Sequence, residues 1–233
     1  MRKLTAIFLL LLAGTARSQD HVAAPAATDS AVQFYFRTLG ETWPIHNGRV
    51  FYGYPGHVEH AFFPSNGWQK GSVHYDGVWY NDISLMYDAY MDEVIILHPS
   101  STPIRLVSDR VSEFHYLGLS FVRLEFDNNS SMRTGFYEKL TEGPVTIFVK
   151  RTKKIEENIV DLTLEKKFVT AYQFYALKDG VFHSIQKQKS LLEIMKDKRQ
   201  AVVHHLKQQN IKFRKEKEKA ILEMARIYNQ SPN

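Results

Sequence analysis

Apolar and polar residues alternate in short runs from about residue 32 to residue 185, and Gly, Asn, Asp and Pro separate the runs. A period of two is typical of half-buried strands, and turn residues between such runs predict an antiparallel β meander. In residues 145 to 150, Val145, Ile147 and Val149 occupy every second position and give the expected strand one aliphatic face.

Three dipeptides between these runs favour tight hairpins: Asn47-Gly48, Asp76-Gly77 and Asp179-Gly180. A type I′ turn needs positive φ at both central residues, which Asn, Asp and Gly adopt readily. We therefore expect a hairpin at each dipeptide. After the second dipeptide we expect a strand over residues 78 to 87. Its more apolar face carries Trp79, Ile83, Leu85 and Tyr87.

Acidic residues recur beside tyrosine in residues 71 to 97, GSVHYDGVWYNDISLMYDAYMDEVIIL. The strand over residues 78 to 87 would be about 30 Å long, so it would hold Asp76 and Asp88 too far apart to share a metal ion. Asp88, Asp92 and Glu93 could converge locally, but the EF-hand spacing is missing. Asp and Asn commonly stabilise turns by accepting nearby backbone N–H groups, and we favour that role here.

The apolar period changes to 3.6 after Ile185, which predicts a helical tail. We expect a short helix that Ser190 and Glu193 begin as a capping box. A second helix is expected over residues 197 to 209 and a third over residues 214 to 229. Phe213 would pin the loop between these two helices.

These patterns predict a mainly β (α+β) protein, an antiparallel twisted sandwich or open barrel of about ten strands with a C-terminal helical segment packed on it. Residues 1–18 have the charged start, apolar run and small residues of a signal peptide, and residues 19–31 read as a flexible lead. The β domain then covers residues 32–186 and the helical segment residues 187–233. The chain has no cysteine, so its stability must come from its core.

The charge is divided along the chain. Its formal net charge is +5, of which Arg2, Lys3 and Arg17 belong to the expected signal peptide. Residues 19 to 140 hold 8 Lys or Arg against 14 Asp or Glu, whereas residues 141 to 233 hold 19 against 11. The net charges of these parts are therefore −6 and +8.

Two basic runs form a candidate patch for an anionic partner: Lys150, Arg151, Lys153 and Lys154 in the first, and Lys212, Arg214 and Lys215 in the second. Such a patch could bind lipid headgroups or an anionic glycan at a cell envelope. Glutamates interleave the second run, so a solvated helix face with i,i+4 ion pairs is the alternative. An exported protein is not expected to meet nucleic acid.

Candidate chemistry is sparse. His57 and His60 are weak metal candidates, because residues three apart on a strand face opposite sides unless a turn brings them together. The sequence shows neither a nucleophile elbow nor a phosphate-binding glycine loop or dinucleotide fingerprint. We therefore expect a non-enzymatic protein without a cofactor. A hydrolase would need converging ionisable groups, for which the histidines to inspect are His57, His60, His74 and His115.

Four stretches resemble a family of uncharacterised exported proteins common in Bacteroidota: NGRVFYGY at 47 to 54, GSVHYDGVWYNDISLMYDAYMDEVI at 71 to 95, GFYEKLTEGPVTIFVKRTKKIEE at 135 to 157 and KSLLEIMKDKRQAVVHHLKQQN at 189 to 210. They occur in order across nearly the whole chain after the signal peptide. The resemblance implies export to the periplasm, the outer membrane or the cell exterior. It supplies no catalytic motif or cofactor.

The sequence thus suggests an exported cell-envelope protein of the binding or assembly type, with an envelope protein, lipid or glycan as partner and no transmembrane segment after the signal peptide. One alternative is a periplasmic carrier that holds a lipid or acyl chain in a curved sheet. Another is a hydrolase of envelope polymers.

Overall fold

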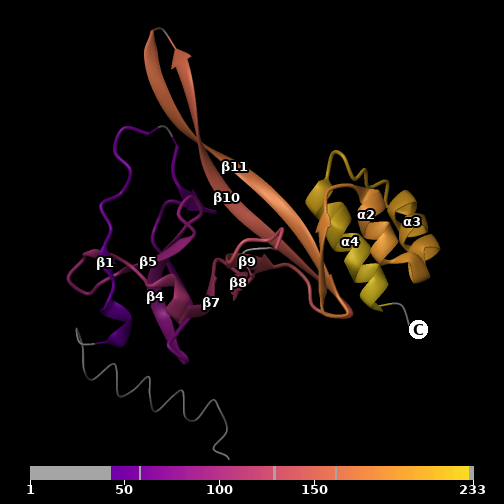
Figure 1. Cartoon of the computed structure of the whole chain (residues 1–233), viewed down its shortest axis with the longest axis horizontal. Coiled ribbons are helices and arrows are strands. Elements are labelled where there is room, and N and C mark those ends of the chain that lie inside the picture. Colours follow the sequence, from indigo (N-terminus) through magenta and orange to yellow (C-terminus); the bar gives the residue numbers. More distant parts are fainter. Residues whose placement is uncertain (1–42, 58, 128–129, 161, 231–233) are drawn as a thin grey trace, which may run out of the picture.

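An open antiparallel sheet is the framework of the computed structural model, which describes residues 43–57, 59–127, 130–160 and 162–230 (Figure 1). Its twelve strands are β1 (Arg49–Val50), β2 (Phe62–Phe63), β3 (Gln69–Tyr75), β4 (Val78–Asp88), β5 (Glu93–Leu97), β6 (Pro103–Arg105), β7 (Val111–Tyr116), β8 (Leu119–Leu124), β9 (Gly135–Lys139), β10 (Val145–Val160), β11 (Thr163–Lys178) and β12 (Val181–Ile185). The predicted mainly β fold is confirmed. The expected signal peptide and flexible lead lie outside the described residues.

The sheet is a meander with one return. Its order is β1-β6-β5-β4-β3-β7-β8-β9-β10-β11-β12, and β2 pairs with β4 beside this path. The chain moves outward from β3 to β6, returns to place β7 against the other edge of β3, and continues to β12. Strands close in sequence are therefore mostly neighbours in the sheet.

Three α-helices follow the sheet, as the change of period predicts. They are α2 (Gln188–Ile194), α3 (Arg199–Gln208) and α4 (Lys217–Gln230), and short 3-10 helices form η2 (Pro44–His46), η3 (Ser108–Arg110) and η4 (Lys196–Lys198). The predicted capping box is wrong, because Lys187 is the N-cap residue of α2 and Ser190 lies inside the helix. No helix in the described part of the chain has the length and hydrophobicity to cross a membrane.

Two of the three predicted hairpins are confirmed. Asp76-Gly77 joins β3 to β4 with φ of +51° and +78°, and Asp179-Gly180 joins β11 to β12 with φ of +52° and +77°. The prediction for Asn47-Gly48 is wrong, since Asn47 has φ of −81° at the end of η2. Gly48 instead permits close packing: a Cβ there would lie 2.4 Å from the carbonyl oxygen of Arg105, next to the β1–β6 pair.

The apolar face predicted for residues 78 to 87 is partly wrong, because the strand contains a bulge. Asp82 has φ of +61°, and the β3–β4 register shifts opposite it. An extra residue reverses the alternation of side chains. Tyr80 is therefore buried with Ile83, Leu85 and Tyr87, while Trp79 lies on the other face between two histidine rings.

Two main hydrophobic cores stabilise opposite ends of the molecule (Figure 1). We call residues 43–139 the β unit; its core is rich in aromatic side chains. We call residues 187–230 the helical unit; its core packs against Val145, Ile147 and Val149, the predicted aliphatic face. Phe213 packs on this second core, as expected.

The β10–β11 hairpin joins the two ends. Each strand has 16 residues, paired in continuous register from Val145↔Lys178 to Val160↔Thr163. At about 3.3 Å per residue the hairpin is about 50 Å long. It starts beside the helices, passes the β unit and projects beyond it (Figure 1).

Candidate functional site

The β4–β5 turn confirms turn chemistry for Asp88. This carboxylate is fully buried and accepts the N–H groups of Tyr90 at 2.9 Å and Met91 at 3.0 Å, and the hydroxyl of Tyr54 at 2.5 Å. Burial raises the pKa of Asp88, an effect that these hydrogen bonds partly offset. Burial also raises the pKa of Tyr54 well above its usual range, with a further contribution from Asp88.

Asp92, in the same turn, holds β10. Its Oδ2 lies 2.5 Å from the ammonium nitrogen of Lys150, and its carboxylate also accepts the hydroxyl of Tyr87 and the N–H of Phe136. Lys150 is buried and also donates to the carbonyl of Phe136 at 2.9 Å. Burial lowers the pKa of Lys150, while Asp92 acts in the opposite direction. The turn thus fixes the middle of the long hairpin to the β unit.

Arg151 connects the β unit to the helical unit. It donates to Glu138 at 2.7 Å and, through its two terminal nitrogens, to both carboxylate oxygens of Glu218 in the first turn of α4. Its guanidinium also lies over the rings of Phe63 and Tyr172. Burial lowers the pKa of Arg151, but the bonds to Glu218 and Glu138 outweigh this effect and raise it overall.

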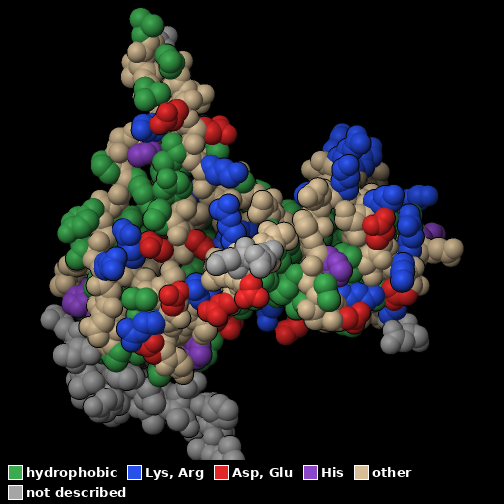
Figure 2. All heavy atoms as spheres, in the orientation of Figure 1, with side chains coloured by type: hydrophobic (Ala, Val, Ile, Leu, Met, Phe, Trp, Pro, Cys, Tyr) green, Lys and Arg blue, Asp and Glu red, His purple; other side chains and the backbone are tan. Residues whose placement is uncertain are grey.

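The predicted anionic-partner patch does not form one surface. Lys150 and Arg151 are buried in the internal ion pairs above, so their charges are not presented to a partner. Lys153 is half-buried and Lys154 exposed on β10. Lys212, Arg214 and Lys215 are exposed in the loop between α3 and α4. Figure 2 shows Lys and Arg side chains gathered over the helical unit.

The two weak metal candidates have different neighbours. His57 stacks on Phe168 with the ring centres 5.0 Å apart, and its Nδ1 lies 3.0 Å from the carbonyl oxygen of Pro55. His60 stacks on Phe62, and burial lowers its pKa. Among the described residues, no three His, Cys, Asp or Glu side chains are grouped to hold a metal ion.

The other two histidines form a row on the open face of the sheet. His74 and His115 flank Trp79, with ring centres 5.0 and 5.1 Å from it. His74 contacts the hydroxyl of Ser112, and Nε2 of His115 lies 2.5 Å from a carboxylate oxygen of Glu113. These contacts extend across β3, β4 and β7. Both histidines are half-buried, so the row is partly exposed to solvent.

Aromatic side chains fill the inner face of the β unit, where a carrier would hold its ligand. Phe114 stacks on Phe121 with the ring centres 4.7 Å apart, and Tyr87 and Phe136 pack around this pair. All four side chains are buried. These side chains belong to the packed hydrophobic core of the β unit.

An aromatic collar supports the hairpin where it leaves the β unit. Phe168 of β11 is 2% exposed and packs against Tyr54, His57 and Tyr90, with ring centres 5.0 to 5.4 Å from its own. The N–H of Lys153 also donates to the carbonyl of Ala89 at 2.9 Å. The collar, residues Tyr54, His57, Tyr90 and Phe168, therefore marks the last firm support of the hairpin.

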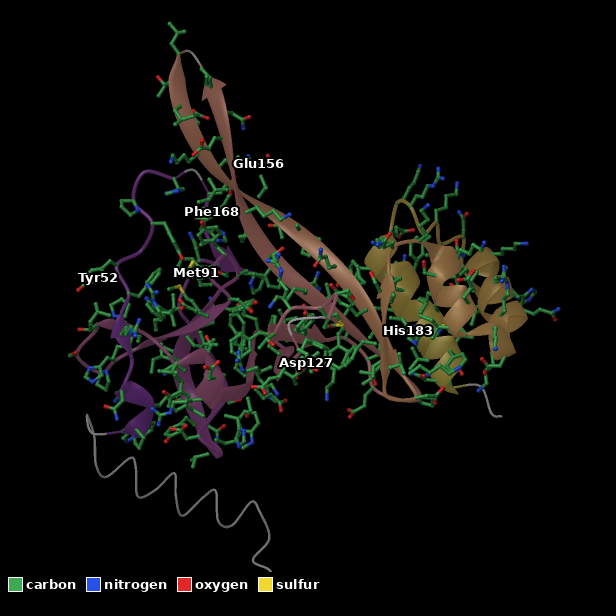
Figure 3. The ribbon with its side chains drawn as sticks, in the orientation of Figure 1. Tyr52, Met91, Asp127, Glu156, Phe168 and His183 are labelled. Carbon is green, nitrogen blue, oxygen red and sulfur yellow. The ribbon has the colours of Figure 1, made fainter. Side chains whose placement is uncertain are left out.

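Beyond the collar, residues 156–160 and 162–167 form a projecting arm (Figure 3). Opposite charges face each other across it, and Lys166 lies 3.1 Å from Glu157. The exposed fractions of Ile159, Leu162 and Leu164 are 77%, 99% and 54%. The arm therefore carries three aliphatic side chains in solvent at the end of the molecule farthest from the helices (Figure 1). We call this end, with Ile159, Leu162 and Leu164, the tip.

The edges of the arm are also open within the described residues. β9 pairs with β10 only at Phe148 and Val149, and β12 pairs with β11 only from Phe174 to Lys178. Unpaired strand edges present free N–H and C=O groups that can take up a further strand. The alternation of apolar and polar residues does not predict this arm, although EE at 156–157 and KK at 166–167 are placed symmetrically about its tip.

Neither a protein-family model, nor a curated protein, nor a solved structure matches this chain.

Proposed function

We propose that the protein is an exported, non-enzymatic cell-envelope protein of the binding or assembly type, and that it binds a partner protein through the arm. The observation that carries the proposal is the exposure of Ile159, Leu162 and Leu164 at the end of the arm. Exposed large apolar groups gathered at one place commonly mark protein interaction sites. The collar holds these groups away from the β unit and leaves them open to a partner.

The energetics favour a protein that covers the tip. Burying one aliphatic side chain of this size contributes about 1.5 to 3 kcal/mol, so covering three partly exposed ones contributes on the order of 4 kcal/mol before the entropy of association is subtracted. An added strand along an open edge supplies main-chain hydrogen bonds as well. The expected partner therefore has an apolar groove beside an extended segment that pairs with β10 or β11.

Charge around the tip favours a protein over a lipid surface. The described residues of the arm contain three acidic residues, Glu156, Glu157 and Glu165, against Lys166 and Lys167. Segments that bind membranes are typically basic and use aromatic side chains as anchors. The described residues of the arm include no aromatic side chain, and they carry no net positive charge, because Glu156 and Glu157 face Lys167 and Lys166.

A double variant of the tip tests this function. Ile159→Asp with Leu162→Asp adds two charges to exposed positions, so the fold should persist while the apolar contact is lost. We expect the wild type to migrate in a larger complex than its monomer when the envelope of the source cell is extracted gently. The double variant should migrate as the free protein.

Val181→Asp is the matched control, because Val181 is also 54% exposed but lies at the start of β12, at the other end of the hairpin. It should leave the complex intact. A wild-type protein that migrates alone, or a complex that survives the tip substitutions, would contradict the proposed function.

A further inference from the structure

A basic pocket of about 450 Å³ lies at the junction of β12, α2 and the loop between α3 and α4. Its lining residues are Gln186, Lys187, Gln188, Lys189, Phe213, Arg214 and Lys217. Four of the seven are cations, two are amides, and none is acidic. Of the predicted anionic-partner patch, only Arg214 lines this pocket.

Neighbouring carboxylates are engaged elsewhere. Glu218, next to Lys217 in sequence, has both carboxylate oxygens bonded to Arg151. Glu216 lies 3.0 Å from Lys219, which does not line the pocket. Glu193 lies 3.8 Å from Lys189, and both of these side chains are largely exposed, so this pair is weak. The positive charge of the pocket is therefore only slightly compensated.

Two contacts fix the pocket to the fold. Phe213 packs against the core of the helical unit, which holds the loop that carries Arg214. The ammonium of Lys217 lies over the ring of Phe174, 5.2 Å from its centre. The surroundings add to the local field, because residues 187 to 230 hold 12 Lys or Arg against 5 Asp or Glu. Charges of one sign around a concave site concentrate ions of the opposite sign.

We propose that this pocket binds a multiply charged phosphate group, either free or carried by a lipid. A guanidinium matches the paired oxygens of a phosphate, and lysines supply additional point charges. The glutamine amides at 186 and 188 add neutral donors. The pocket is larger than one phosphate needs and accommodates a diphosphate or a phosphate with its attached group.

Isothermal titration of the full chain with inorganic pyrophosphate at low salt tests this site. The pocket variant is Lys187→Gln with Arg214→Gln, and the control is Lys196→Gln with Lys207→Gln, two exposed lysines of the helical unit that do not line the pocket. Both variants lose two charges. We expect pyrophosphate to bind the wild type and the control equally, and the pocket variant at least about 10-fold more weakly, as is usual when charge-assisted hydrogen bonds are removed.

Two further probes identify the ligand. Citrate carries similar charge on carboxylates and should bind more weakly than pyrophosphate. Vesicles that contain phosphatidic acid should recruit the protein through the same residues if a lipid carries the phosphate; pyrophosphate binding without recruitment would point to a free phosphate ligand. Absent binding, equal losses in the two variants, or citrate as strong as pyrophosphate would overturn the proposal.

Discussion

The ammonium of Lys150 lies 2.5 Å from Oδ2 of Asp92, which places an ion pair between the long hairpin and the β4–β5 turn, with the lysine buried and the aspartate half-buried. The carbonyl of Ala89 in this turn also accepts the N–H of Lys153. Of the acidic residues that recur beside tyrosine, Asp88 and Asp92 thus have a structural role in the turn where the hairpin crosses the β unit. These two contacts, which we call the fastening of the hairpin, hold the base of the arm in place.

Removing the charge of Asp92 should weaken this fastening. Asp92→Asn leaves the ammonium of Lys150 buried without its counter-charge, so we expect the free energy of unfolding to fall by about 2 to 3 kcal/mol. The control is Asp82→Asn, because Asp82 and its partner Lys70 are exposed and 3.6 Å apart. The control should change stability by less than about 0.5 kcal/mol. Equal values for the two variants in urea denaturation would refute the role of Asp92.

Gly135 should be required for the same ion pair. Its φ is +148°, and a Cβ would lie 1.9 Å from Oδ2 of Asp92 and 2.7 Å from the ammonium nitrogen of Lys150. Gly135→Ala should therefore cost about 2 kcal/mol or more in urea denaturation. Gly53→Ala is the control, since Gly53 has φ of +75° and open space around it, and should cost about 1 kcal/mol. A smaller loss at Gly135 than at Gly53 would contradict this packing.

The buried carboxyl of Asp88 should make stability depend on pH. Because burial raises its folded pKa, its contribution to folding is complete below the unfolded pKa and is lost as pH rises through the folded value. Asn does not titrate and can still accept the two N–H bonds of the turn. The stability of Asp88→Asn relative to wild type should therefore increase from about pH 4 to about pH 7. The free energies of unfolding of the two proteins are measured by urea denaturation. If the difference between them stays constant or falls as pH rises, the account of Asp88 is contradicted.

The collar and the arm should respond differently to truncation. Phe168→Ala empties a buried aromatic site and should cost about 3 kcal/mol. Ile159→Ala, nine positions before Phe168 and on the opposite strand of the same hairpin, removes only exposed surface and should cost less than about 0.5 kcal/mol. If urea denaturation gives similar losses for both, the arm packs against the protein and is not available to a partner.

Local patterns predicted the elements that local chemistry determines. Asp76-Gly77 and Asp179-Gly180 form their hairpins because their positive φ angles are properties of the dipeptides themselves. Val145, Ile147 and Val149 face the helices because alternation along a strand is fixed by backbone geometry. The hairpin predicted at Asn47-Gly48 does not form, because the packing of Gly48 against Ile104 and Arg105 determines its position more than turn preference does.

Charges and long-range contacts limited the rest of the prediction. Lys150 and Arg151 look like surface residues in sequence, and only the fold brings Asp92, Glu138 and Glu218 to them. The bulge at Asp82 likewise depends on pairing with β3. The arm went unrecognised because a strand that continues beyond its sheet has the same alternation as one inside it. Its free edges are a property of the assembled sheet alone.

Site-specific photocrosslinking at the tip tests most directly whether the arm binds a partner protein. A benzophenone amino acid replaces Leu162 in one variant and Val181 in another, and both are irradiated in intact cells of the source organism. We predict one discrete protein adduct from position 162, absent from position 181 and lost when Ile159→Asp is added. Adducts to lipid alone, no adduct, or the same adducts from both positions would contradict the proposed function.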